Sequence, residues 1–389
     1  MSADPLFVLT ALALCVVASE RAARLPYLHH LGSALLVIVL TATLANVGVI
    51  PTYSDENPIY AGIFEYLGPV AIFLLLLRVN VRGLAQAGLP MVSLFLLGSV
   101  GTMLGVVVAM WLVGGSRAFG ELYYALGGMY AGTYIGGGIN FNAIALEYGV
   151  VKNGPLFAAA ATVDNAMTTL WMAVTVVAPR MLRTAPPVAM PEAMAPAAEA
   201  ATHEERESVA PAELALLLGS AAAAVWISGL ASAWIQGQSG IAVPSILILT
   251  TLALVLAQLP AVQELRGTRV TGWLAVLFFL AVIGTLCDFA SLAQIGALGR
   301  DLIVLVVVAV GIHGLLLFGV ASLLHIDPCM TAIASQANIG GATSALALAR
   351  SLERPDLALP AVLIGSLGNA IGTYLGFLIA VFLRAFPGT

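Results

Sequence analysis

Two stretches of the sequence decide the fold: GTYIGGGINFNAIA at residues 132–145 and QANIGGATSALALA at residues 336–349. Each places a cluster of glycines and polar side chains inside a long apolar segment, where a membrane helix is expected to be most apolar. Glycine weakens a helix interior, and it adopts the positive φ values that other residues avoid. Non-helical backbone survives at membrane depth only where protein or a water-filled cavity satisfies its polar groups. The two stretches therefore predict two interrupted segments that line a cavity.

The composition of the whole chain requires a membrane. Of its 389 residues, 60% are hydrophobic and 9% are charged, whereas about 25% are charged in soluble domains. The mean hydropathy is +1.01. We therefore expect an all-α polytopic protein of the cell (inner) membrane, whose partners are the lipid bilayer and a small-molecule substrate. No basic patch supports nucleic-acid binding, and a homodimer is left open.

Hydropathy divides the chain into twelve apolar segments, since a helix needs about 20 residues to cross the hydrocarbon core. The segments cover residues 5–22, 31–50, 58–79, 90–114, 122–147, 155–178, 211–236, 242–260, 270–287, 299–325, 328–349 and 358–384. Residues 179–210 are rich in proline and acidic side chains and read as a flexible linker. We therefore expect an N-terminal membrane repeat at 1–178 and a C-terminal one at 211–389.

The two halves repeat each other. Ile135-Gly136-Gly137 matches Ile339-Gly340-Gly341 at an offset of 204 positions, and the same offset pairs Asn165 with Asn369. Residues 84–88 (LAQAG) match residues 292–296 (LAQIG) at a similar offset. Internal repeats with interrupted segments at corresponding positions are typical of secondary transporters.

The distribution of arginine and lysine favours one topology of two. If all twelve segments span, 8 of the 15 basic residues fall on the inner side, which is no bias. If segments five and eleven instead dip in and return, the inner side holds 11 of the 15. Those eleven are Arg21, Arg24, Arg78, Arg82, Arg180, Arg183, Arg206, Arg266, Arg269, Arg350 and Arg354. The positive-inside rule favours the second arrangement, with about ten spans, two re-entrant segments, inverted repeats of five spans each and both termini outside.

A family resemblance supports this architecture. The two glycine-rich stretches, followed by VDNAMTTLW at 163–171 and SLGNAIGTYLG at 366–376, resemble the domain-of-unknown-function 819 family of bacterial integral membrane proteins. The arrangement of one glycine-rich re-entrant loop in each inverted half more distantly resembles the sodium/glutamate symporters. The resemblance implies the architecture and the transporter class, and it implies no particular substrate.

Asp164 is the first candidate for a functional side chain, because it is a carboxylate near the middle of the sixth segment. A carboxylate at that depth costs several kcal/mol unless it faces a cavity or an ion. Asp164 is expected to carry a proton or to help bind Na⁺, or else to bond only to neighbouring amides. Its neighbour Asn165 and the repeat partner Asn369 are expected either to contact substrate or to bond between helices.

Polar groups and exposed backbone of the two loops complete the candidate site. Their amide and hydroxyl side chains are Thr133, Asn140, Asn142, Gln336, Asn338, Thr343 and Ser344. The loop backbone that is expected to open toward the ligand belongs to Gly136, Gly137, Gly138, Gly340 and Gly341. N–H groups of half-helices suit anions, and unwound carbonyls suit Na⁺.

Three other ionisable residues lie in or beside the segments. Glu65 is expected near the outer interface, and Asp288 is expected at a helix end. His313 is alone in the tenth segment, and a lone histidine is more often a packed, hydrogen-bonded residue than a ligand. No motif of an enzyme is present, and the sequence predicts no resident metal and no cofactor apart from Na⁺ or H⁺ as a coupling ion.

Three functions are consistent with these features. The first is an ion-coupled secondary transporter of a small organic anion or amino acid. The second is a channel or passive facilitator, in which the two loops build a filter and no titratable residue is needed. The third is a membrane scaffold that transports nothing. We favour the transporter, because it alone uses the repeats, the interrupted segments and the central carboxylate together.

Overall fold

The computed structural model describes residues 4–25, 28, 32–53, 57–79, 81–182, 209–240, 242–287 and 296–386. Of these residues 86% are helical, and no strand occurs among them. The prediction of an all-α protein is confirmed. Residues 183–208 of the predicted linker, Asp288 and residues 292–295 of the repeated LAQ motif lie outside the described part.

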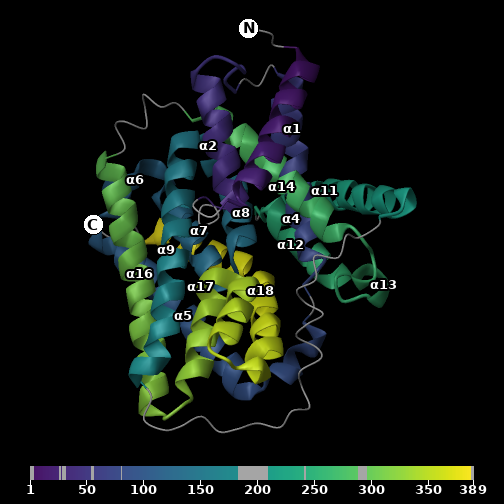
Figure 1. Cartoon of the computed structure of the whole chain (residues 1–389). Coiled ribbons are helices and arrows are strands. Elements are labelled where there is room, and N and C mark those ends of the chain that lie inside the picture. Colours follow the sequence, from purple (N-terminus) through teal and green to yellow (C-terminus); the bar gives the residue numbers. More distant parts are fainter. Residues whose placement is uncertain are drawn as a thin grey trace. The chain divides into compact units, whose positions relative to one another are not determined.

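Figure 1 shows the helices along the chain. In chain order they are α1 (Pro5–Ala22), α2 (Gly32–Asn46), α3 (Pro58–Gly62), η1 (Ile63–Leu67), α4 (Gly68–Leu76), η2 (Arg82–Ala87), α5 (Leu89–Leu112), α6 (Gly115–Phe119), η3 (Gly120–Leu122), α7 (Tyr123–Gly136), α8 (Gly138–Glu147), η4 (Val150–Lys152), α9 (Gly154–Leu182), α11 (Pro211–Ser239), α12 (Ser245–Leu256), α13 (Pro260–Gln263), α14 (Thr268–Thr285), α16 (Gly296–Leu323), α17 (Pro328–Ser351), η6 (Pro355–Leu357) and α18 (Ala358–Ala385).

Each of the twelve apolar segments contains one or more of these helices. Seven helical stretches among the described residues are long and apolar enough to cross a bilayer, namely Pro5–Ala22, Pro58–Leu76, Leu89–Leu112, Pro211–Ser239, Thr268–Thr285, Leu298–Leu323 and Pro355–Ala385. Helices α2 and α12 are apolar but shorter. The chain is therefore a multi-pass membrane protein. Helix α9 continues to Leu182, so the first residues of the predicted linker, from 179, are helical.

Side-chain caps and prolines define several of the helix starts. The carboxylate of Asp4 accepts hydrogen bonds from the backbone N–H groups of Leu6 and Phe7 at the start of α1. Asn57 caps α3, and Asp327 caps α17, in each case with proline at the first helical position. Proline is tolerated there because the first N–H groups of a helix have no intrahelical partner.

The described chain divides into two compact units, and each takes residues from both sequence halves. Unit 1 comprises residues 1–78, 145–166 and 208–302. Unit 2 comprises residues 79–144, 167–207 and 303–389. The predicted repeats at 1–178 and 211–389 are therefore interwoven in both units, and the repeat boundaries themselves stay a prediction.

Unit 1 is built around α14, which packs against α1, α2 and α4. Helix α11 packs against α12 and α4. The third segment contains a π-helical turn, η1, between α3 and α4. Pro69 explains this turn, since proline has no N–H to donate to the carbonyl of Glu65 one helical turn earlier.

Unit 2 is built around α18, which packs against α7, α17, η2 and α5. Figure 1 shows α17 and α18 side by side. The contact with α7 is close because Gly128 meets Gly376: a methyl group at Gly376 would lie 2.7 Å from the carbonyl oxygen of Gly128. Small residues let membrane helices approach in this way. Both glycine-rich stretches are thereby held against one helix.

Candidate functional site

The first glycine-rich stretch is a helix broken at one residue. Helix α7 ends at Gly136, Gly137 has φ of 87°, and α8 begins at Gly138. The left-handed φ at Gly137 is strained for any residue with a Cβ atom. The N–H of Gly137 donates to the carbonyl of Thr133 at 2.7 Å, and the N–H of Asn140 donates to the carbonyl of Gly137 at 3.0 Å. The break therefore keeps its backbone groups bonded on both sides.

Beyond Gly137 the chain folds back on itself. A methyl group at Gly132 in α7 would lie 2.7 Å from Cδ1 of Ile144 in α8. In an unbroken helix these two positions, twelve residues apart, would be separated by about 18 Å. A methyl group at Gly128, one turn further back, would still lie 3.4 Å from Ile144. Helices α7 and α8 therefore form a helical hairpin whose tip is Gly137.

The tip of this first hairpin rests on α18. Gly136 lies so close to the carbonyl of Gly368 that no side chain fits between them. The buried side chain of Asn140 accepts a hydrogen bond from the hydroxyl of Thr373 at 2.6 Å. The carboxamide oxygen of Asn369 lies 3.9 Å from the place where a Cβ atom of Gly137 would be. The structure thus brings together Gly136, Gly137, Asn140 and Asn369, four of the residues predicted from sequence.

The second stretch is broken at the repeat partner of Gly137. Gly341, 204 positions later, has φ of 75° inside α17, and the helix continues on both sides of it. The hydroxyl of Ser344 donates to the carbonyl of Gly341 at 3.1 Å. Asn140, the repeat partner of Ser344, makes the same contact through its side-chain amide, to the carbonyl of Gly137 at 3.4 Å. The two breaks therefore have a positive φ at the same repeat position, and in each a side chain three residues later bonds to the carbonyl of the glycine.

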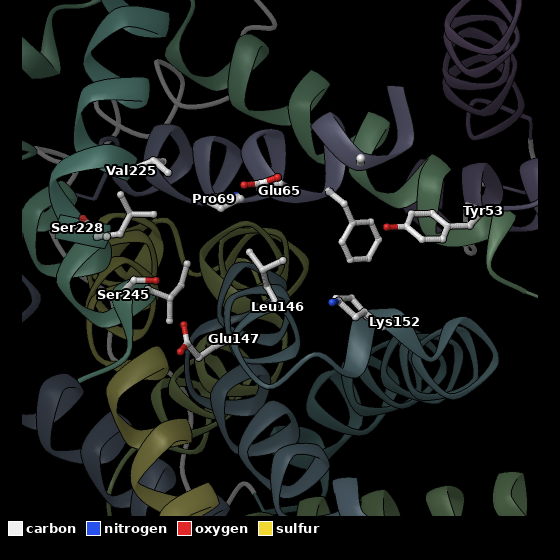
Figure 2. Close-up of a pocket in the computed structure, with 15 residues that line it drawn as sticks. Tyr53, Glu65, Pro69, Leu146, Glu147, Lys152, Val225, Ser228 and Ser245 are labelled. Atoms are coloured by element: carbon white, nitrogen blue, oxygen red, sulfur yellow. The ribbon is translucent and has the colours of Figure 1, made fainter. Parts of the chain in front are cut away.

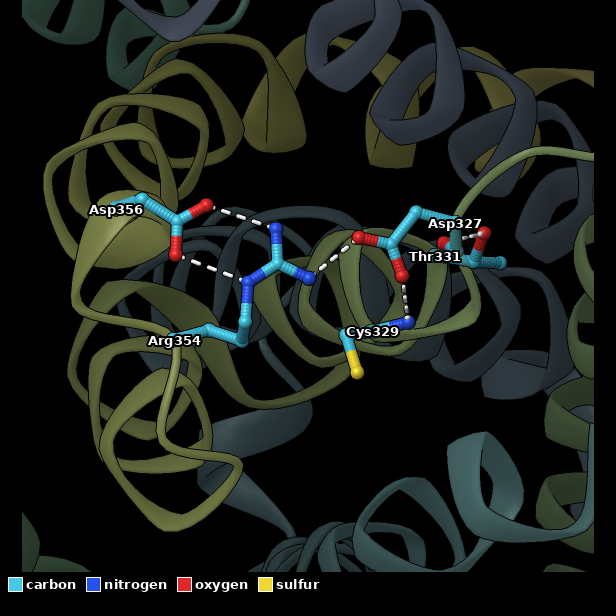
Figure 3. Close-up of polar contacts among 5 residues, drawn as sticks. All are labelled: Asp327, Cys329, Thr331, Arg354 and Asp356. Carbon is cyan, nitrogen blue, oxygen red and sulfur yellow. Dashed lines mark hydrogen bonds and ion pairs between the residues drawn. The ribbon is translucent and has the colours of Figure 1, made fainter. Parts of the chain in front are cut away.

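The two ends of α17 are joined by ion pairs (Figure 3). Arg354, just after the helix, donates to the carboxylate of Asp327, the residue that caps its start. The same guanidinium binds Asp356 through two hydrogen bonds of 2.9 and 2.7 Å. Its pKa is raised further above the ordinary value, chiefly by the bonds to Asp356 and then by those to Asp327.

This link shows that α17 is also a hairpin. A straight helix of its 24 residues would be about 36 Å long. Its ends could not then share one guanidinium. The chain must reverse at Gly341, so the two arms lie side by side and their ends meet at Arg354.

A buried polar network holds the first arm of α17 against α5. Asn338, which is fully buried, accepts a hydrogen bond from the hydroxyl of Ser99 at 2.9 Å. Its amide donates to the carbonyls of Phe95 and Ala334, each at 3.1 Å. All of its polar atoms are thus used by the protein, which makes Asn338 a packing residue in this conformation.

His313 belongs to the same network. Its Nδ1 lies 2.8 Å from the carbonyl oxygen of Gly98, and its Nε2 lies 2.9 Å from the hydroxyl of Ser335. A carbonyl can only accept, so Nδ1 carries the proton, and Nε2 accepts from Ser335. The indole of Trp171 donates to the same hydroxyl at 3.0 Å. His313 is therefore a hydrogen-bonded packing residue, as expected of a lone histidine.

Gln336, in the same hairpin, has a side-chain hydrogen-bond donor that is not satisfied. Its carboxamide oxygen accepts a hydrogen bond from Thr175 at 3.2 Å. Its Nε2 is buried and has no hydrogen-bond partner among the described residues. Leaving a donor unsatisfied in the interior costs about 1–3 kcal/mol. The sequence ranks Gln336 no higher than its neighbours, since nothing in the motif reveals which amides the fold will satisfy.

The other predicted residues differ in their solvent exposure. Thr133 is buried, and Asn142 and Ser344 are half-buried. Thr343 and Gly138 are exposed, and Gly340 fits closely beside Ser344 and Gln336. Asp164 and Asn165 are half-buried in the part of α9 that belongs to unit 1. The amide of Asn165 donates to the carbonyl of Ala161 at 2.9 Å.

Among the described residues no group of three or more His, Cys, Asp or Glu side chains is placed to hold a metal ion. The oxygen donors that surround the hairpin tips are amides, hydroxyls and backbone carbonyls. Such groups suit an alkali cation or the polar end of a small solute.

Comparison with known proteins places the sequence among membrane proteins of unknown function. The profile described as "Protein of unknown function (DUF819)" matches residues 7–386. The chain is 28% identical over 378 residues to a protein of Bacillus subtilis (strain 168) described as "Uncharacterized membrane protein YjcL". The aligned part covers 93% of this chain and 92% of the relative. The predicted resemblance to the DUF819 family is confirmed.

Proposed function

We propose that this chain, which belongs to the DUF819 family of membrane proteins, is a secondary active transporter that couples a small organic solute to Na⁺ or H⁺. The observation that carries the proposal is the pair of glycine-broken hairpins at repeat-related positions, whose tips both lie in unit 2. Half-helix ends and unwound carbonyls at such breaks are what transporters use to bind ions and substrates near mid-membrane.

In this proposal the hairpins are re-entrant and enter the membrane from opposite faces. An odd number of spans in each half, five, inverts the second repeat relative to the first. The bias of basic residues then puts both termini outside the cytoplasmic membrane. Unit 2 carries the solute as an elevator-like or rocking body, and unit 1 serves as the scaffold.

The polar groups at the tips indicate the chemistry of the solute. Gln336 offers a buried N–H donor, and the half-helix that starts after Gly341 offers further N–H groups. Both favour an acceptor with negative charge, such as a carboxylate. Asn369 supplies an amide at the other tip, where the side chain of Asn140 is bonded to Thr373 and to the carbonyl of Gly137. A carboxylate-bearing metabolite, an organic anion or an amino acid, fits this set of donors.

Asp164 is assigned the coupling role in this proposal. It is a carboxylate in the segment that follows the first hairpin, next to Asn165, the repeat partner of Asn369. Asp164→Asn keeps the volume of the side chain and removes its charge. We expect this variant to lose accumulation against a gradient while solute exchange, which needs no net ion movement, continues.

The proposal is tested by uptake into proteoliposomes. Purified protein is reconstituted, an isotope-labelled metabolite mixture is added outside, and the contents are identified by mass spectrometry under a Na⁺ gradient, a pH gradient or neither. We expect a carboxylate solute to accumulate above its outside concentration only with one of the gradients. Equilibration without accumulation, unchanged in Asp164→Asn, would instead establish a passive facilitator. No uptake of any solute would favour a scaffold.

A further inference from the structure

Unit 1 contains a cavity that the hairpins do not explain. It has a volume of about 510 Å³ and lies between η1 and α4, the end of α8 with η4, and helices α11 and α12. Cavities of about 300–1,000 Å³ are the usual size for small-molecule sites. Apolar side chains such as Phe64, Leu146 and Val225 form much of its wall.

Three charged side chains line this cavity: Glu65, Glu147 and Lys152. Lys152 is the single lysine of the chain. Among the described residues none of the three takes part in an ion pair. Glu147 is half-buried, and Glu65 and Lys152 are exposed. Two carboxylates and one ammonium group that line one cavity without an ion pair among them match a ligand that carries both signs of charge.

A buried hydroxyl points to a ligand independently of the charges. Ser228 of α11 is 1% exposed, lines the cavity, and has no hydrogen-bond partner in the described structure. Other helical hydroxyls of this chain donate to the carbonyl four residues earlier, as Ser239 and Thr251 do. Ser228 makes no such bond, so its hydroxyl is available for a group inside the cavity.

The wall that carries Glu65 is itself unusual. Glu65 lies in the π-helical turn η1, beside Phe64, which also lines the cavity. Single π-helical turns inside α-helices occur often at functional sites, because they shift side chains out of the regular helical register. Here Pro69 produces the turn, and the turn presents Phe64 and Glu65 to the cavity.

The charges are separated along the cavity (Figure 2). Glu147 lies with Ser228 and Ser245 on one side of the view, Lys152 lies on the other, and Glu65 lies on the opposite wall from Glu147. Burial raises the pKa of Glu147, and a hydrogen bond from the backbone N–H of Ile246 lowers it. A ligand ammonium near Glu147 and Glu65 would offset that burial.

We propose that this cavity binds a zwitterion: an ammonium group held by Glu147, Glu65 and the serine hydroxyls, and an anionic group held by Lys152. The apolar wall accommodates the body of the ligand. Two sources supply this chemistry in a membrane protein, a free α-amino acid and the headgroup of an ethanolamine phospholipid. The site lies in unit 1 and does not depend on the proposed transport through unit 2.

The test is thermal stabilisation of the full-length protein in detergent, with two probes: L-leucine and dihexanoyl-phosphatidylethanolamine. We expect one of them to raise the melting temperature in a saturable way. For the amino-acid source, N-acetyl-leucine and leucine methyl ester, which each lack one charge, should have no effect. For the lipid source, dihexanoyl-phosphatidylglycerol, which lacks the ammonium, should have none.

Variants assign any stabilisation to this cavity. Lys152→Met and Glu147→Gln should each weaken the apparent affinity about tenfold, which corresponds to about 1.4 kcal/mol. Glu121→Gln, a carboxylate outside the cavity, should leave the affinity unchanged. Ser228→Ala serves as a mild second probe that keeps every charge, and a two- to fivefold loss is expected.

Three results would overturn the proposal. One is that neither probe stabilises the protein. Another is that a probe lacking one charge stabilises it equally. The third is that Lys152→Met and Glu147→Gln, melting as cooperatively as the unaltered chain, keep the full affinity. That last result would place any amino-acid binding elsewhere, including the hairpins of unit 2, and would leave the transport proposal intact.

Discussion

The two hairpins break with the same backbone conformation, and they differ in how their ends are held. Both reverse at a glycine with positive φ, Gly137 in the first and Gly341 in the second. The first is fastened at its tip, where Gly136 meets Gly368 and Asn140 bonds to Thr373. The second is also held near its tip, where Ala342 packs against Gly365, and its ends are joined in addition by Arg354, which pairs with Asp327 and Asp356. The repeat has therefore kept the break and diverged in the contacts around it.

The divergence can be read at the repeat positions. Asp327 corresponds to Tyr123, and Arg354 corresponds to Val150. Tyr123 donates instead to the carbonyl of Leu383 on α18, at 3.0 Å. Both tips lie against α18, the second where Ala342 meets Gly365, so the ion pairs are an additional contact at the ends of the second hairpin. This difference predicts that loss of the ion pairs destabilises the second hairpin and leaves the first unchanged.

The largest expected effect comes from the shared feature, the two glycines. Gly137→Val and Gly341→Val should each abolish uptake, because a β-branched residue with positive φ is strained by about 1–3 kcal/mol. The protein should still insert into the membrane, since the change is confined to a tip. The measurement is the initial rate of uptake in proteoliposomes. Size-exclusion chromatography of the protein extracted from the membrane checks that each variant has inserted and folded.

Gly319→Val in α16 is the matched control, because a side chain there meets nothing within 4 Å and the backbone has no positive φ. It should transport normally. Normal transport by Gly137→Val and Gly341→Val would mean that the glycines act only as spacers.

A smaller effect is expected from the ion pairs at the ends of the second hairpin. Arg354→Gln removes the link between the ends of α17 and leaves the carboxylates of Asp327 and Asp356 without their cationic partner. The arginine side chain is 19% exposed and binds Asp356 in a bidentate manner. Breaking an exposed ion pair costs about 0.2–1 kcal/mol of stability, and breaking a buried one costs about 3–5 kcal/mol. The cost for a pair in this environment lies between these values. We expect a loss of about 2 kcal/mol of stability.

A double-mutant cycle checks this loss. Arg354→Gln, Asp327→Asn and the double variant are melted side by side, and a coupling energy of about 1 kcal/mol is expected. The exposed pair Arg300–Asp301 is the comparison, with coupling near zero. Equal coupling in both pairs would remove the special role of the α17 ends.

The smallest expected effect concerns pH. Glu147 ends the first hairpin, and its repeat partner is Ser351, which does not titrate. Burial raises the pKa of Glu147 above its ordinary 4.5, so the folded protein holds the proton more tightly than the unfolded chain. Its contribution to stability is therefore complete below that ordinary value and is lost as the pH rises through the raised one.

The melting temperature of the native chain minus that of Glu147→Gln should thus fall as the pH rises above the ordinary pKa of 4.5. Glu65 and Lys152 line the same cavity and are left unchanged in both proteins. Ser351→Ala should show a flat difference. A flat difference for Glu147→Gln as well would mean that this carboxylate is not buried in solution.

Much of the fold was predictable from sequence, for a physical reason. The length of each apolar segment, and so the division into twelve segments, follows from the thickness of the bilayer. The glycine pairs mark positions where a regular helix is interrupted. The repeat offset of 204 even predicts that the second break falls at Gly341. The contacts around the breaks were not predictable in this way, because they depend on which side chains meet in space.

The candidate site shows the same division. Asn140 was predicted in the first loop, and Asn369, which was expected to contact substrate or to bond between helices, lies beside the tip of that loop. Asn338 was predicted as a ligand group, yet α5 and the preceding turn of α17 satisfy its polar atoms. Gln336 received no special rank, although its Nε2 is a buried donor that the described structure leaves open. Whether an amide is available is decided by its neighbours from distant helices, which the motif does not contain.

The most direct test of the central proposal is the sidedness of the hairpin ends. In a variant without Cys15, Cys287 and Cys329, single cysteines are placed at Ser116 and Asn153, which flank the first hairpin, and at Leu324 and Ser351, which flank the second. All four positions are exposed, and each is labelled in intact cells with a membrane-impermeant maleimide. Two re-entrant hairpins in inverted repeats predict that Ser116→Cys and Asn153→Cys react from outside, and that Leu324→Cys and Ser351→Cys react only after permeabilisation. If the two cysteines that flank either hairpin react from opposite sides, that segment spans the membrane and the proposed inverted architecture is contradicted.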